Sequence, residues 1–167
     1  MRLSGDPADL NAEPQGALRL ADEDATARFG ATLARVLAPG DAVLLSGDLG
    51  AGKTALARSA IQSLLPTYED VPSPTFTLAQ IYEAASPIWH ADLYRVNDPD
   101  EIVEIGLADA FDDAIVFVEW PDRLGPYAPR RALSLTLAYG EPDGRVVAWT
   151  ASGGDWAAVT CALEAFE

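Results

Sequence analysis

The sequence is short of several residue types, and each shortage narrows what the protein can be. Cys161 is the single cysteine, which excludes an internal disulfide and a cysteine-based zinc site and fits a reducing compartment. We expect Cys161 to be a small buried hydrophobe on the last helix. No apolar run approaches the roughly 18 residues that span a bilayer, and the first residues carry neither a secretion nor a transit signal. The sequence therefore predicts a soluble, cytoplasmic protein with no membrane partner.

Positive charge is also scarce. The chain has 11 Lys and Arg residues against 26 Asp and Glu residues, which gives a formal net charge of −15. Because affinity for a nucleic-acid backbone comes mostly from Lys and Arg side chains, the chain alone is not expected to grip one. A role on nucleic acid would need a partner. Lys53 is the only lysine.

Apolar residues are plentiful, at 49% of 167 residues, which is enough for the core of one domain. Residues 1–15 lack periodicity and predict a loose N-terminal tail, followed by a single domain over residues 16–167. The periodicity and turn signals predict these elements in order: strand 17–20, helix 22–38, strand 42–45, helix 53–65, a hairpin of 76–82 with 88–95, short helices from 98 to 111, strand 114–118, a hairpin of 132–138 with 145–150, and a last helix capped by Asp155.

The strongest motif is a phosphate-binding loop between a predicted buried strand and a predicted helix. Its residues are Gly47, Asp48, Leu49, Gly50, Ala51, Gly52, Lys53 and Thr54. In such a loop backbone N–H groups and the helix N-terminus attract phosphates. The lysine reaches the β- and γ-phosphates, and the hydroxyl residue after it ligates Mg²⁺. The motif therefore predicts a site for ATP and Mg²⁺, with Lys53 and Thr54 in separate roles.

Two acidic residues are candidates for the metal and the attacking water. Glu119 ends the predicted strand 114–118, and a carboxylate at that place can bind Mg²⁺ and orient water. Strand alternation puts His90, Asp92 and Tyr94 on one face, which makes Asp92 a second candidate near the metal. We interpret His90, the only histidine, as a structural hydrogen-bonding residue rather than a catalytic base.

Five segments together resemble the TsaE (YjeE) family, the bacterial ATPases of tRNA threonylcarbamoyladenosine synthesis. The segments are GDLGAGKT at 47–54, SPTFTL at 73–78, HADLYR at 90–95, EIGL at 104–107 and VEWP at 118–121. They occur in the family's order over roughly residues 17–150, and the combination is far more specific than the loop alone. Ala91 is a small departure, since the family often has an aromatic residue there.

The resemblance implies an α/β fold of the P-loop NTPase type, with three layers and a parallel central sheet that carries antiparallel strands at its sides. It implies that ATP hydrolysis supports the transfer of a threonylcarbamoyl group to an adenosine next to the anticodon. The transfer belongs to TsaD working with TsaB, on which this protein would dock, so tRNA would be reached only through partners. Such an ATPase is slow or partner-stimulated.

The resemblance also implies residue roles. Thr54 and Glu119 resemble Mg²⁺ ligands, and Asp92 resembles a catalytic or metal-shell carboxylate. Trp120 and Glu23 are similar to family positions beside the nucleotide. A nucleotide-responsive switch loop is implied at Ser73, Pro74, Thr75, Phe76 and Thr77.

Other readings of the loop are possible. A GTPase is set aside because guanine recognition uses an Asn-Lys-x-Asp motif and Lys53 is the only lysine. A small-molecule kinase would use Arg130 and Arg131 as lid residues on the transferred phosphoryl group, although no lid-sized insertion is apparent. A nucleotide-gated binding module, in which ATP only sets the shape of the loop at 73–77, is the non-enzyme alternative.

Overall fold

A computed structural model describes residues 8–167, so the first half of the predicted tail, residues 1–7, lies outside the described residues. Residues 8–15 form neither a helix nor a strand. Their backbone nevertheless contacts the domain. The amide of Ala8 donates a hydrogen bond to the carbonyl of Pro129 at 3.0 Å, and the amide of Gln15 donates one to the carbonyl of Trp149 at 2.8 Å.

One seven-stranded sheet organises the chain, with the strand order β1-β7-β6-β2-β5-β4-β3. Neighbouring strands among β6, β2, β5 and β4 run parallel, while β7, β1 and β3 join the sides of this group antiparallel. This arrangement confirms the predicted α/β fold with its parallel centre. The strands are β1 Gly16–Leu20, β2 Ala42–Ser46, β3 Ala79–Tyr82, β4 Ile88–Asp92, β5 Ile115–Glu119, β6 Ala132–Tyr139 and β7 Arg145–Ser152.

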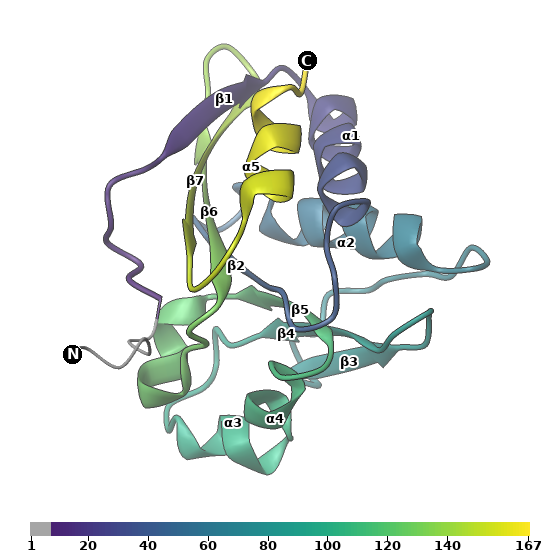
Figure 1. Ribbon diagram of the computed structural model, residues 1–167, viewed down its shortest axis with the longest axis vertical. Coiled ribbons are helices and arrows are strands. Elements are labelled where there is room, and N and C mark those ends of the chain that lie inside the picture. Colours follow the sequence, from purple (N-terminus) through teal and green to yellow (C-terminus); the bar gives the residue numbers. More distant parts are fainter. Residues whose placement is uncertain (1–7) are drawn as a thin grey trace.

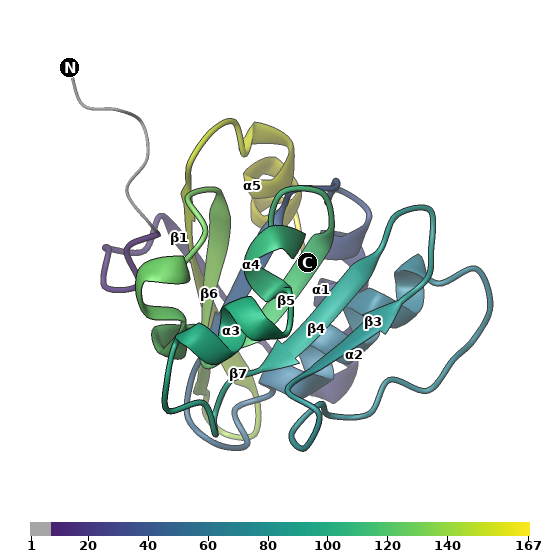
Figure 2. The same ribbon diagram turned by 90° about the horizontal axis from the view of Figure 1, so that it is seen from below.

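Helices cover both faces of the sheet (Figures 1 and 2). On one side lie α1 Glu23–Ala34, α2 Lys53–Leu64 and α5 Ala157–Glu164, and on the other α3 Asp100–Glu104, α4 Leu107–Ala110 and the 3₁₀ segment η1 Pro121–Tyr127. Side chains of β2 alternate between the two layers, so Val43 and Leu45 enter one apolar core while Ala42 and Leu44 enter the other. Within the described residues, no helix is long and apolar enough to cross a membrane.

The predicted first hairpin is shorter than expected. Its strands begin at Ala79 rather than Phe76 and end at Asp92 rather than Arg95. Leu78 has a left-handed backbone, with φ of 63°, which no regular strand residue adopts. After Asp92 the chain turns, because the Asp92 carboxylate accepts a hydrogen bond from the amide of Tyr94 at 3.0 Å. Both ends of the hairpin therefore stop next to the sheet edge where the candidate residues lie.

The expectation for Cys161 is wrong. Helix α5 buries Val159 and Leu163, which are four residues apart and share one face. Cys161 lies midway between them in sequence, points to the opposite side and is exposed.

Candidate functional site

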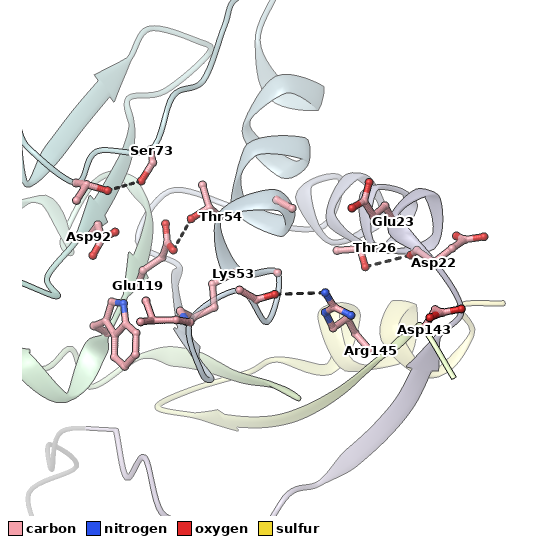
Figure 3. Close-up of a pocket in the computed structure, with 16 residues that line it drawn as sticks. Asp22, Glu23, Thr26, Lys53, Thr54, Ser73, Asp92, Glu119, Asp143 and Arg145 are labelled. Carbon is pink, nitrogen blue, oxygen red and sulfur yellow. Dashed lines mark hydrogen bonds between the residues drawn. The ribbon is translucent and has the colours of Figure 1, made fainter. Parts of the chain in front are cut away.

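The candidate residues gather at the carboxyl end of the parallel strands. The register pairs Glu119 with Leu45 of β2 on one side and with Asp92 of β4 on the other. The loop that follows Ser46 therefore lies beside both carboxylates. A cavity of about 460 Å³ lies at this edge, lined by Lys53, Thr54 and both carboxylates among others (Figure 3). Its position is where open α/β sheets hold their ligands.

Three glycines let the phosphate-binding loop bend as it does. Gly47, Gly50 and Gly52 have φ of 144°, 78° and 107°, a region that other residues rarely adopt. A Cβ atom on Gly47 would collide with the carbonyl oxygen of Leu137 on the neighbouring β6. Gly52 is the N-cap of α2 and supplies no side-chain cap. The first N–H groups of this helix therefore face the cavity without a side-chain acceptor from their cap, as an anion site requires.

The side chains of the predicted loop differ in where they lie. Leu49, Gly50, Gly52, Lys53 and Thr54 line the cavity. Asp48 is exposed and offers its backbone carbonyl to Lys53, whereas Ala51 is buried in the core beneath the loop. Asp48 and Ala51 would therefore contribute to the predicted phosphate-binding loop through their backbone atoms rather than their side chains.

A brace from the β6–β7 hairpin holds this loop from outside. Arg145 donates from Nε to the carbonyl of Ala51 at 2.9 Å and from Nη2 to that of Gly50 at 3.3 Å. The Tyr139 hydroxyl donates to the carbonyl of Leu49 at 3.0 Å, and the Arg145 guanidinium stacks on the Tyr139 ring. Sequence reasoning missed both residues. The predicted hairpin included Arg145 but ended its first strand at Ala138, and nothing local connects either residue to a loop more than 80 residues away.

Lys53 is held inside the loop that it closes. Its Nζ atom donates to the carbonyls of Gly47 at 2.6 Å and Asp48 at 2.9 Å, and lies 4.3 Å from the centre of the Trp120 ring. Burial lowers the pKa of Lys53, and the nearby carboxylates of Glu119, Asp92 and Asp48 oppose that shift. Trp120, which the resemblance puts beside the nucleotide, lines this cavity and packs against the ammonium.

Glu119 joins two residues from different elements. Its Oε1 accepts a hydrogen bond from the Thr54 hydroxyl at 2.7 Å, and its Oε2 lies 2.8 Å from Nε2 of His90. Only 2% of the surface of Glu119 is exposed, and His90 is fully buried. The predicted metal ligands are thus in direct contact. We expected His90 to be a structural hydrogen-bonding residue, and its partner, which the sequence did not identify, is Glu119.

Asp92 lies at the cavity wall with 7% of its surface exposed. Burial raises the pKa of Asp92, and the charge of Glu119 raises it further; the bond from the Tyr94 amide and the charges of His90 and Lys53 lower it in part. A carboxylate whose pKa is raised holds a proton more strongly. Asp92 is therefore suited to accept a proton from a water molecule in the cavity.

The predicted switch loop borders the same cavity. Ser73 and Thr75 line it, and their hydroxyl oxygens are 2.7 Å apart. Pro74 is buried, while Thr77 is exposed and accepts a hydrogen bond from Gln80. Phe76 is 84% exposed. Its ring lies under the guanidinium of Arg95, which is also on the surface. The hydroxyl side of the loop therefore faces the site and its aromatic ring faces solvent.

The opposite end of the cavity is lined by the start of α1 and the β6–β7 hairpin. Glu23, predicted from the resemblance, lies there, and so do Asp22, Thr26, Asp143 and Arg145, which sequence reasoning did not select (Figure 3). Asp22 caps α1 by accepting from the Ala25 amide at 2.8 Å. Its capping pattern was visible in the sequence, but its place at the cavity was not.

The donor set fits a magnesium nucleotide better than a metal bound by protein alone. Among the described residues, no three His, Cys, Asp or Glu side chains form a cluster that could hold a metal ion. Thr54 and Glu119 offer oxygen donors in contact with each other. Mg²⁺ is commonly held by one or two such ligands together with phosphate oxygens. The loop and Lys53 supply the phosphate side of that arrangement.

Comparisons with known proteins identify the family of this chain. A model of the family described as "Threonylcarbamoyl adenosine biosynthesis protein TsaE" matches residues 20–147. Proteins named "tRNA threonylcarbamoyladenosine biosynthesis protein TsaE" are 41% identical over 63% of this chain in Rickettsia felis, 39% over 75% in Nostoc sp. and 37% over 71% in Haemophilus influenzae. The alignments span 62% of the Rickettsia protein, 80% of the Nostoc protein and 78% of the Haemophilus protein. This chain therefore matches less than two thirds of the length of the Rickettsia relative.

A solved structure has the same fold. The crystal structure of Bacillus subtilis YdiB superposes with a TM-score of 0.76 at 24% identity, covering 92% of this chain and 97% of that one. At this identity the likeness speaks for the fold alone.

Proposed function

The chain belongs to the TsaE family of threonylcarbamoyl adenosine biosynthesis proteins, and from this membership we propose that it binds and hydrolyses Mg-ATP. In doing so it supports turnover of the TsaD–TsaB pair, which transfers the threonylcarbamoyl group to adenosine in tRNA. The observation that carries the proposal is the meeting of Lys53 and Thr54, at the start of α2, with Asp92 and Glu119, at the ends of β4 and β5, around one cavity.

Each residue has a separate task in this proposal. Mg²⁺, when bound, neutralises charge that develops on the phosphate oxygens. Thr54 and Glu119 would hold the ion, because their oxygens already lie together at 2.7 Å. Lys53 and the loop amides bind phosphate oxygens. Asp92 orients the attacking water and takes its proton, which its raised pKa favours.

The surrounding surface suggests why partners are needed. The net charge of −15 leaves the chain poorly suited to hold tRNA itself. Partner subunits would therefore supply the tRNA contacts, and the switch loop at 73–77 is the segment of the cavity rim that they could adjust. Hydrolysis is then slow in the isolated protein and faster in the complex, in the cytoplasm where tRNA is modified.

The positions of Arg130 and Arg131 argue against the kinase alternative. Arg131 donates to the Asp41 carboxylate at 2.8 Å, and the next residue, Ala132, pairs with Ala42 at the start of β2. The phosphate-binding loop follows the other end of β2. The five residues of this strand separate its two ends by about 16 Å. Arg130 and Arg131 therefore lie at the wrong end of the sheet to act on a phosphoryl group at the loop.

The test measures ATP hydrolysis by this protein alone and with an added TsaD–TsaB pair, together with modified tRNA formed over several turnovers. We expect the pair to stimulate hydrolysis and repeated modification to require this protein, with Lys53→Met as the inactive control. Repeated modification without any hydrolysis would favour the nucleotide-gated binding module. If the protein has no effect on an otherwise active TsaD–TsaB pair, the proposal fails.

A further inference from the structure

His90 is a buried polar residue to which the proposed chemistry assigns no task. It lies on β4 two residues before Asp92, so both side chains share one face of the sheet. Its Nε2 atom is 2.8 Å from Oε2 of Glu119, whereas its Nδ1 atom is buried and has no hydrogen-bond partner among the described residues. The ring therefore makes one polar contact, and that contact is with a predicted metal ligand.

The contact has a fixed direction. An ionised carboxylate can only accept hydrogen bonds, so Nε2 of His90 donates and its proton points at Oε2. The contact therefore requires a proton on Nε2, whatever the state of Nδ1. Glu119 then has one oxygen engaged by His90 and the other directed at Thr54.

We propose that His90 is the positioning residue of the Mg²⁺ site: by donating from Nε2 to Glu119 it fixes the carboxylate with Oε1 toward Thr54. The proposal rests on the Mg-nucleotide function proposed above. A glutamate side chain rotates about several bonds, and ordering it on ligand binding costs conformational entropy. Because His90 orders Glu119 beforehand, loss of the donor should weaken Mg²⁺ binding by about 10-fold or more, as for other hydrogen-bond partners of metal ligands.

Two variants of equal length separate the donor from the space it fills. His90→Met and His90→Gln both place an unbranched side chain in the pocket, but only glutamine keeps an N–H donor near the position of Nε2. The readout is the affinity for a fluorescent ADP analogue in EDTA and then in rising MgCl₂, which needs no hydrolysis. Tyr82→Phe is the control, since it removes a buried hydroxyl without a hydrogen-bond partner from the adjacent strand β3.

We expect His90→Met to bind the analogue in EDTA as the wild type does and to need about 10-fold more Mg²⁺ for the same tightening. His90→Gln should need less than about threefold more. In a Glu119→Gln background, His90→Met should have no further effect on the Mg²⁺ requirement, because the histidine acts through the glutamate. An unchanged Mg²⁺ requirement in His90→Met, or equal loss in both variants, would overturn the proposal.

A spectroscopic measurement on the wild type covers the case in which His90→Met does not fold. His90 is the only histidine, so the long-range ¹H–¹⁵N spectrum of an untagged, ring-labelled sample is unambiguous. A proton on Nε2 supports the proposal, and a ring protonated on Nδ1 alone contradicts it. Failure of the wild type to bind the analogue at all would instead reject the proposed nucleotide function. Equal Mg²⁺ requirements in the wild type and His90→Met would reject the role of His90 alone.

Discussion

Replacing Asp92 by asparagine should remove activity and at the same time stabilise the fold. The carboxyl group is buried, and its pKa is raised by burial and by the neighbouring charge of Glu119. The folded state therefore disfavours the ionised form that the unfolded chain carries at neutral pH. Each pKa unit of such a shift corresponds to about 1.4 kcal/mol. The asparagine side chain keeps an oxygen for the Tyr94 amide, so no existing hydrogen bond need be lost.

The sign of this effect depends on pH. Above the raised pKa both states are ionised and the folded state of the wild type carries the full penalty. As the pH falls through the raised pKa toward the ordinary value of 3.8, the folded state takes up the proton first and the penalty disappears. Asp92→Asn should therefore raise the Tm at pH 7, by about 2–4 °C for each kcal/mol of penalty removed in a chain of this length, and this gain should shrink toward pH 4.

The activity of the same variant should fall by roughly 10²- to 10⁴-fold in kcat, because the amide cannot accept a proton. Nucleotide affinity should change little. Thermal melts at several pH values and ATP turnover with the TsaD–TsaB pair measure the two effects, with Asp112→Asn as the control for the same change at an exposed position. A lower Tm of the variant at pH 7, or a difference in Tm that does not change with pH, would refute the argument that burial of the Asp92 carboxylate destabilises the fold. Unchanged turnover would show that another residue accepts the proton.

Three further variants test the loop and the metal site. Lys53→Met removes the ammonium that would meet the phosphates, so affinity for a fluorescent ATP analogue should fall by about 100-fold; near wild-type affinity would reject the site. Glu119→Gln should bind the analogue normally in EDTA but lose Mg²⁺-dependent hydrolysis by about 100-fold, and the assignment fails if turnover persists. Gly47→Ala adds a Cβ that collides with the Leu137 carbonyl and should cost about 1–3 kcal/mol in urea unfolding; an unchanged unfolding midpoint would show that the loop can relax.

The central features were predictable because their signals are contiguous. The loop at 47–54 carries its own glycines, lysine and hydroxyl between a strand and a helix, and the helix indeed begins at Lys53. Glu119 was selected because it follows a predicted strand, and Asp92 because strand alternation gave it a face beside His90. That β4 ends at Asp92 and pairs in parallel with β5, which brings both carboxylates to one edge, came from the structure.

The remaining features depend on contacts that no local pattern encodes. Arg145 and Tyr139 brace the loop from about 90 residues away. The residues before Ala79 have strand-like composition, yet the left-handed backbone of Leu78 ends the strand there. Cys161 was placed on the wrong face because the last helix is short and mostly apolar, so its composition does not say which side packs on the domain.

The outward orientation of Cys161 makes the native protein ready for labelling. It is the only thiol in the chain and it is exposed on α5, so a maleimide dye attaches at one position without any substitution. Helix α5 packs against α1, whose first turn lines the cavity. A dye at Cys161 therefore sits outside the cavity residues, on a helix that contacts one of its walls. It gives a fixed reference point for energy transfer to a fluorescent nucleotide or to a labelled partner subunit.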